Sequence, residues 1–120
     1  MHDALRPKHF LKWAVDMFGP VALERRERLT RFVEEAIELA HAEGMPRDTL
    51  SKIIDRVHSR PQGHPTKEIG QAQATLELFA ESIGLSADDL AAGEFKRVQS
   101  IPKEEWTARH AAKIALGIAN

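Results

Sequence analysis

Hydrophobic residues recur every three or four positions along most of the chain, which is the period of an amphipathic α-helix. No stretch alternates polar and apolar residues over the length of a β-strand. Glycine and proline interrupt the helical pattern, and each interruption predicts the end of one helix and the start of the next. The pattern predicts helices over residues 7–18, 21–43, 46–58 and 66–83, a fifth between Ser86 and Pro102, and a last one over 103–118.

The residues at the predicted helix ends agree with this division. Gly44 and Gly84 stand where a helix ends in the left-handed conformation, and Ser86 followed by Asp89 predicts a capping box. The segment 59–65 contains two prolines and a glycine, which predicts a loop. The sequence therefore predicts an all-α protein, a helical bundle of about five to six helices with short connections, folded as a single domain over residues 1–120.

Composition and charge narrow the classes of function. The chain holds 17 Lys and Arg against 18 Asp and Glu, and this balance gives no global reason to bind nucleic acid or an anionic membrane. Because no predicted helix has a dense basic face, a helix-turn-helix DNA-binding protein is also disfavoured. Cysteine is absent, which excludes disulfides, thiolate zinc sites and a cysteine nucleophile. No apolar run approaches the roughly 18 residues of a membrane span, so we expect a cytoplasmic protein.

Three glutamates, Glu34, Glu35 and Glu38, share one side of the predicted helix 21–43, opposite its apolar face. Carboxylates on successive helical turns suit a hard cation such as Mg²⁺, which takes oxygen ligands. A solvated helix face is the simpler alternative, because glutamate is a good helix former. Both interpretations stay open on this segment alone.

Glu68, on the predicted helix 66–83, lies at the border of the apolar stripe rather than on the water-facing side. A carboxylate at a boundary between helices needs a partner, since an unpaired desolvated charge is costly. That partner is a metal ion, an arginine, or water at the rim of the interface.

The segments Glu34-Glu35-Ala36-Ile37-Glu38 and Glu68-Ile69-Gly70-Gln71 together resemble the MazG-like all-α nucleoside triphosphate pyrophosphohydrolases. That family carries E-E-x-x-E on one helix and E-x-x-D on a later one. The surrounding segments 27–39 and 59–65 are similar to a short branch of the family found in phages and bacteria. The resemblance spans about residues 10 to 100 and implies a MazG-like fold that is completed by oligomerisation, as a homodimer or homotetramer.

The resemblance also implies an activity and a set of site residues. The expected reaction is Mg²⁺-dependent hydrolysis of a nucleoside triphosphate to a monophosphate and pyrophosphate, with Mn²⁺ as a substitute ion. Glu34, Glu35 and Glu38 are the implied catalytic residues, of which Glu35 and Glu38 bind the metal. Glu34 is either a further ligand or the group that orients the attacking water. Glu68 is the implied ligand from the facing helix.

Gln71 departs from the family pattern, because it stands where the family usually has aspartate. Its carbonyl oxygen can still coordinate a metal or bind a metal-bound water, but it cannot act as a base and one negative charge is lost. The alternative function is therefore a catalytically degenerate MazG-like protein that serves as a nucleotide-binding or protein-interaction module.

Several cations are candidates for binding the substrate's phosphates. Arg60 and Lys67 flank the loop before Glu68, although the same residues also fit an ordinary polar loop. Arg31 is the one cation on the acidic side of its helix, and Lys96 with Arg97 is a second choice.

Other residues that invite a functional interpretation have structural explanations. We expect His58 and His64 to be surface residues rather than metal ligands. Phe10, Trp13 and Phe18 suit a hydrophobic core better than a wall for a nucleobase. Trp106 is expected to anchor the last helix or an oligomer contact, and Asp88 with Asp89 to stabilise a helix start.

Overall fold

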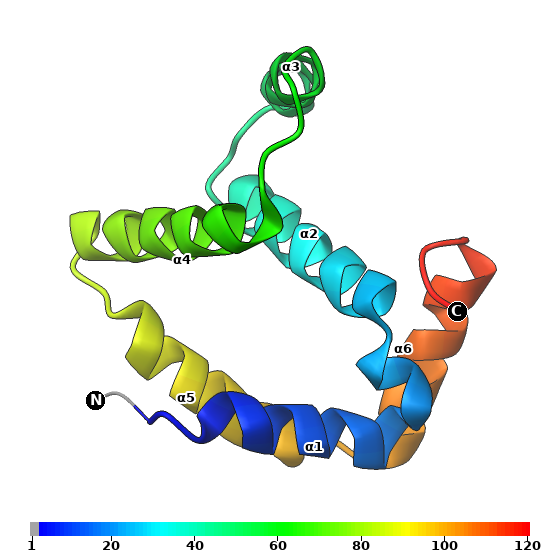
Figure 1. The fold of residues 1–120 in the computed structure, drawn as a ribbon. Helices are drawn as coiled ribbons and strands as arrows, with labels where there is room; N and C mark the ends of the chain where they lie inside the picture. Colours follow the sequence, from blue (N-terminus) through cyan, green and yellow to red (C-terminus); the bar gives the residue numbers. More distant parts are fainter. Residues whose placement is uncertain (1–2) are drawn as a thin grey trace. The chain divides into compact units, whose positions relative to one another are not determined.

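A computed structural model describes residues 3–120, and all of the regular structure in this range is helical. The expected all-α class is therefore confirmed (Figure 1). No helix in the described range is both long enough and apolar enough to cross a membrane. The elements are α1 (Arg6–Phe18), the short 3₁₀-helix η1 (Pro20–Leu23), α2 (Arg25–Ala42), α3 (Arg47–His58), α4 (Pro65–Ser82), α5 (Ala87–Gln99) and α6 (Lys103–Ala115).

The chain divides into two compact units, one formed by Met1–Val33 with Ser86–Asn120 and the other by Glu34–Leu85. We call them the terminal unit and the central unit. The boundary falls within α2, so the first part of this helix belongs to the terminal unit and its last turns belong to the central unit. The expectation of one domain over residues 1–120 stays a prediction.

In the terminal unit, α1 packs against η1, α5 and α6. Aromatic rings fill this contact. Phe10 stacks on Phe95 with ring centroids 4.6 Å apart, while Trp13 and Phe18 both meet the ring of Trp106 edge to face, at 5.5 and 6.0 Å. Such pairs contribute about 0.5–1.5 kcal/mol each beyond their buried area. Phe10, Trp13 and Phe18 thus pack against other aromatic rings, as expected, although each remains half-buried rather than fully buried.

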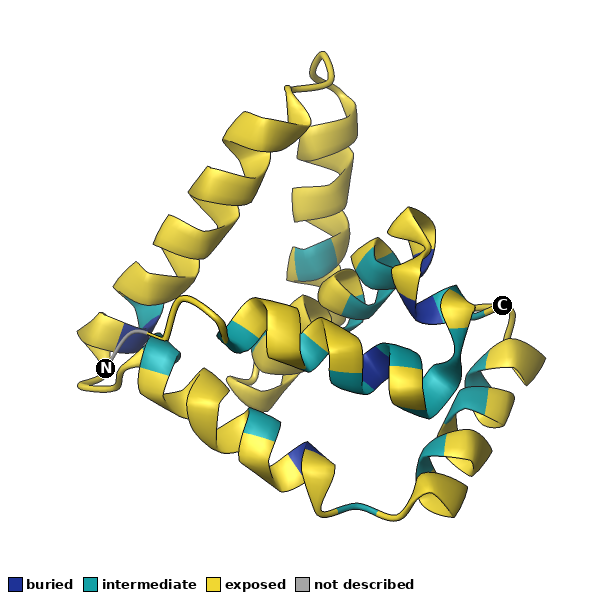
Figure 2. Ribbon diagram, turned by 60° about the horizontal axis from the view of Figure 1, so that its bottom comes forward, coloured by how far each residue is buried: buried dark blue, intermediate teal, exposed yellow. Residues whose placement is uncertain are grey.

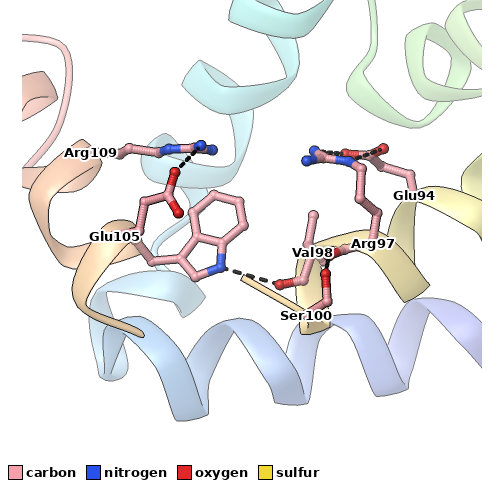
Figure 3. A network of polar contacts seen from close by, with 7 residues as sticks. Glu94, Arg97, Val98, Ser100, Glu105 and Arg109 are labelled. Carbon is pink, nitrogen blue, oxygen red and sulfur yellow. Dashed lines mark hydrogen bonds and ion pairs between the residues drawn. The ribbon is translucent and has the colours of Figure 1, made fainter. Parts of the chain in front are cut away.

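Polar contacts join the end of α5 to the start of α6 (Figure 3). The indole N–H of Trp106 donates a hydrogen bond to the carbonyl of Val98 at 3.3 Å, which confirms Trp106 as an anchor of the last helix. On α5, the Nε of Arg97 donates to Glu94 at 2.9 Å. This hydrogen bond holds the pKa of Glu94 below its usual value of 4.5, although desolvation by partial burial opposes the shift.

The last residues of the chain are bonded to the beginning of α2 within the terminal unit. Arg31 donates a hydrogen bond to the carbonyl of Ile118, and the amide of Asn120 donates to Glu24 at 2.9 Å. The ring of His110 on α6 bonds the carbonyl of Asn120, also at 2.9 Å. The segment after α6 is therefore held by side chains from two helix regions.

The central unit contains the last turns of α2, the whole of α3 and α4, and the loop between them. No two of these three helices pack closely against each other within residues 34–85. Figure 2 shows their surfaces as almost wholly exposed, and Ala80 is the only buried residue between positions 34 and 85. The predicted apolar stripes are present but uncovered in a single chain. The exposed large apolar residues of this unit are Ile37, Leu39, Met45, Ile53, Ile54, Val57, Ile69, Leu76, Leu78, Ile83 and Leu85.

Candidate metal centre

The carboxylates of Glu34, Glu35 and Glu38 form a cluster on α2. One oxygen from each lies within 4.8 Å of the others. The helix brings them together because Glu34 and Glu38 are four residues apart and Glu35 and Glu38 are three apart, which puts their Cβ atoms about 5–6 Å from one another. The grouping predicted from the sequence is therefore present, and we call these three residues the α2 carboxylate cluster.

The dimensions of the α2 carboxylate cluster suit a hard divalent cation. Mg²⁺ binds oxygen at about 2.1 Å, so two ligand oxygens on opposite sides of the ion are about 4.2 Å apart. The corresponding separation for Ca²⁺ is about 5 Å. The three oxygens lie within 4.8 Å of one another, which is close to both values. The donors are all carboxylate oxygens, which fits Mg²⁺, Mn²⁺ or Ca²⁺ better than a soft metal.

The charges of the α2 carboxylate cluster favour a cation. Glu34 is half-buried, and Glu35 and Glu38 are exposed. Like charges at these spacings cost a few tenths of a kcal/mol per pair on a helix. A bound cation would turn this repulsion into attraction. Exposed acidic groups are also common on helices without any ion.

Glu68 lies in the first turn of α4 and does not belong to the α2 carboxylate cluster. It is exposed to solvent, so the expected boundary between two helices is not formed around it in the single chain. Its side chain lies over Gly63 in the preceding loop. A methyl group at position 63 would stand only 2.5 Å from Oε1 of Glu68.

Gln71 follows Glu68 by three residues on α4, so the two side chains leave the same side of the helix. Gln71 is exposed, and its backbone carbonyl accepts a hydrogen bond from the hydroxyl of Thr75 at 2.6 Å. The second half of the expected ligand set is thus placed on one face of α4, within the same unit as the α2 carboxylate cluster.

The candidate phosphate-binding cations differ in their surroundings. Arg60, in the loop after α3, and Lys67, in the first turn of α4, are exposed residues of the central unit. Lys96 is an exposed residue of α5 in the terminal unit. Arg31 is only 16% exposed, with its Nε 3.4 Å from a carboxylate oxygen of Glu27 in addition to its bond to the tail. Arg31 is thus already engaged in holding the terminal unit.

Two residue positions expected from the sequence agree with the structure. His58 and His64 are exposed, as predicted. Asp88 lies in the first turn of α5, where the helix dipole favours a negative charge. Its carboxylate also forms an ion pair with the guanidinium group of Arg6, at 2.5 Å.

Two features of the structure were not predicted from the sequence. The first is the burial of Glu27, which has 4% of its surface exposed. Its spacing of four residues from Arg31 could have indicated an ion pair between the two side chains. The position of the Glu68 side chain over Gly63 had no such signal, because it depends on a side-chain rotamer.

Comparison with protein-family models, with curated proteins and with solved structures found no match to this chain. The resemblance to MazG-like enzymes therefore rests on the residues of the two acidic segments and the loop between them.

Proposed function

We propose that this protein is a Mg²⁺-dependent nucleoside triphosphate pyrophosphohydrolase. The observation that carries the proposal is the α2 carboxylate cluster, whose oxygens lie within 4.8 Å of one another. Glu68, in the first turn of α4, adds support, because it matches the first position of the second acidic segment of the family that the sequence resembles, although Gln71 departs from the last position of that segment. Nucleoside triphosphates as substrates would place the activity in the cytoplasm.

In this proposal Glu35 and Glu38 hold the metal ion. Glu68 and the carbonyl oxygen of Gln71 would complete its ligands once α4, from this chain or from a second copy, comes against α2, because the single chain has no close contact between these two helices. Bound Mg²⁺ would neutralise phosphate oxygens and lower the pKa of bound water. Glu34 holds the ion or orients the attacking water through its carboxylate. These roles need only oxygen ligands, which are the donors that the cluster supplies.

The proposed reaction adds water to the α-phosphorus of the triphosphate. The new P–O bond forms as the bond between the α-phosphorus and the bridging oxygen breaks, which releases pyrophosphate and leaves a nucleoside monophosphate. The proton lost by the water passes to a carboxylate, for which Glu34 is the candidate, because Gln71 cannot accept it.

Phosphate oxygens need cations beside the metal. Arg60 and Lys67 are the proposed contacts, because both are exposed and lie close in sequence to Glu68. Lys96 is a second candidate. Arg31 would take part only after leaving its contacts with Glu27 and Ile118, so we assign it a structural role first.

Pyrophosphate release from a panel of standard and modified nucleoside triphosphates, at millimolar Mg²⁺ or Mn²⁺, tests this proposal. We expect turnover of at least one nucleotide, and we expect Glu38→Gln to abolish it. Glu43→Gln is the matched control, because Glu43 is an exposed glutamate just beyond α2 that does not belong to the cluster. Absence of release with every nucleotide would refute the activity.

A degenerate, non-catalytic protein is the second candidate function, and Gln71 is the observation that favours it. A neutral amide in place of a carboxylate removes one negative charge from the metal's surroundings. Under this alternative the chain binds nucleotide or a protein partner without hydrolysis. Saturable nucleotide binding without pyrophosphate release would distinguish it from the enzyme.

We also propose that the protein assembles as a homodimer or homotetramer. The helices of the central unit expose a set of large apolar side chains that is unusual for a stable monomer, including Ile69 and Leu78 with 71% and 72% of their surface accessible. A second copy of the chain would cover such faces in a closed symmetric assembly.

A further inference from the structure

The side chain of Glu68 lies beside Gly63, in the space that a Cβ atom at position 63 would take. Glu68 lies in the first turn of the helix, and its backbone N–H donates to the carbonyl of His64 at 3.0 Å. Its side chain turns back toward the loop. A Cβ atom at position 63 would lie 2.5 Å from Oε1, 3.1 Å from Cδ and 3.3 Å from Cγ of Glu68. The carboxylate end of Glu68 therefore occupies the space that any side chain at position 63 would need.

The backbone at Gly63 does not itself require glycine. Its φ is not among the positive values that the structure has at Gly19, Gly44, Gly84 and Gly117. An alanine at position 63 would thus fit the backbone, and the three atoms nearest to its methyl group outside the adjacent residues would all belong to Glu68. The open space at position 63 is significant for the neighbouring carboxylate and not for the path of the chain.

We propose that Gly63 is a positioning residue for Glu68, because the missing side chain leaves the space in which the Glu68 carboxylate lies. The proposal rests on the proposed metal-dependent function, in which Glu68 is a ligand. It adds to that function a residue of the loop which makes no contact with metal or substrate itself.

A side chain added at position 63 would disturb the Glu68 carboxylate more than the fold. The atoms displaced by a methyl group belong to the flexible end of an exposed side chain, which can rotate away at little cost. A metal ligand tolerates less movement, because Mg²⁺ demands nearly octahedral geometry at about 2.1 Å. Gly63→Ala should therefore leave the stability almost unchanged and weaken metal binding.

Gly70 provides a matched control within the same helix. No neighbouring atom lies within 4 Å of the position that an added methyl group would take there, and its φ is also in the ordinary region. Gly70→Ala should preserve metal binding and raise the melting temperature slightly, because alanine is the better helix former.

The test uses the full chain and two readouts. The first is the NMR signal of the Glu68 carboxyl carbon without metal, compared between the wild type, Gly63→Ala and Gly70→Ala. The second is Mn²⁺ affinity, measured by the electron paramagnetic resonance of free Mn²⁺ for the same proteins and for Glu68→Ala and the double variant Gly63→Ala/Glu68→Ala.

We expect the carboxyl signal to move in Gly63→Ala alone. We expect the Mn²⁺ affinity of this variant to fall about tenfold, as when a group that orients a ligand is removed. The double variant should bind like Glu68→Ala, because the methyl group then has no carboxylate to displace.

Each other outcome is informative. An unmoved carboxyl signal in Gly63→Ala would overturn the positioning role, and so would a moved signal with unchanged Mn²⁺ affinity. An equal loss in Gly70→Ala would also overturn it, since the effect would then be one of adding a methyl group anywhere in this region. A wild-type chain that binds no Mn²⁺ would refute the proposed function and Gly63's part in it, while the carboxyl signal would still report separately whether Gly63 sets the place of Glu68.

Discussion

Glu27 is the one buried charged residue among residues 3–120. One of its carboxylate oxygens lies 3.4 Å from Nε of Arg31 and 4.0 Å from a guanidinium nitrogen of Arg28. A buried carboxylate is costly unless cations or hydrogen bonds compensate it. The two arginines supply this compensation, and Arg31 also bonds the tail at Ile118. Glu27 therefore lies beside Arg31, the residue that links α2 to the end of the chain.

Replacing Glu27 by glutamine should destabilise the protein by about 2 kcal/mol, because the arginines lose their buried counter-charge while the shape is kept. Urea denaturation followed by circular dichroism would measure this loss. The exposed Glu43→Gln should change the free energy of unfolding by less than about 0.5 kcal/mol. Equal stability of the Glu27 variant and the wild type would contradict the structural role of this ion pair.

At the scale of single residues, spacing along a helix could be predicted from the sequence and contacts across long separations could not. The α2 carboxylate cluster follows from offsets of three and four residues. The bond from Arg31 to Ile118 joins positions 87 residues apart, and no local pattern indicates it. Arg31 was predicted to bind substrate because it is the one cation on the acidic side of its helix. The structure adds that it bonds the carbonyl of Ile118 and lies beside Glu27, and its binding of substrate stays a prediction.

Most helix ends were predicted closely, because glycine and proline residues near each end mark it in the local sequence. Gly44 and Gly84 follow α2 and α4 with φ of 79° and 76°, a conformation that glycine adopts without strain. The predicted ends at Gly44 and Gly84 are confirmed. Pro65 was predicted to lie in the loop, whereas it begins α4, one residue before the predicted start, and its missing N–H leaves no helical bond unmade there.

The start of α2 was predicted wrongly. The sequence favours one helix from Val21, whereas the structure has the 3₁₀-helix η1 and then an extended Glu24 before α2 begins at Arg25. Ala22 is fully buried in η1, which packs against α1. This tertiary contact decides the local conformation, and helix propensity alone does not distinguish a 3₁₀ turn from the first turn of an α-helix.

Ser86 caps α5, since its hydroxyl accepts a hydrogen bond from the N–H of Asp89 at 3.2 Å. Ser86→Ala should lower the free energy of unfolding by about 1 kcal/mol, because one N–H of the first turn loses its acceptor. Thermal denaturation should show a shift of about 4 °C. Ser86→Asp, which keeps an acceptor at the N-cap, should retain most of the stability, and a loss as large as that of the alanine variant would argue against capping.

At the scale of the whole molecule, the sequence indicates which faces are apolar but not what covers them. The helix predicted over 46–58 carries Leu50, Ile53, Ile54 and Val57, and the predicted bundle would bury these apolar residues of α3. In the structure Ile53, Ile54 and Val57 are exposed, and no helix of the central unit packs closely on α3. Amphipathic periodicity is the same whether the covering partner belongs to the same chain or to another copy.

Sedimentation velocity at tens of micromolar should show a dimer or a larger assembly, because burial of the central unit's apolar side chains stabilises the associated state. Ile54→Lys should reduce the sedimenting mass, since it places a charge on the face of α3 that we expect to be covered. Leu90→Lys is the control, because Leu90 is an exposed residue of α5 in the terminal unit. A monomer alone at this concentration would contradict the proposed assembly.

The central claim is that the α2 carboxylate cluster binds a divalent cation, and calorimetric titration of the full chain with Mn²⁺ tests it most directly. We predict saturable binding by the wild type and by Glu43→Gln, and at least about a tenfold loss of affinity in Glu35→Gln, which removes one charged ligand and keeps its shape. The same affinity in all three proteins, or no binding by the wild type at millimolar Mn²⁺, would contradict the claim.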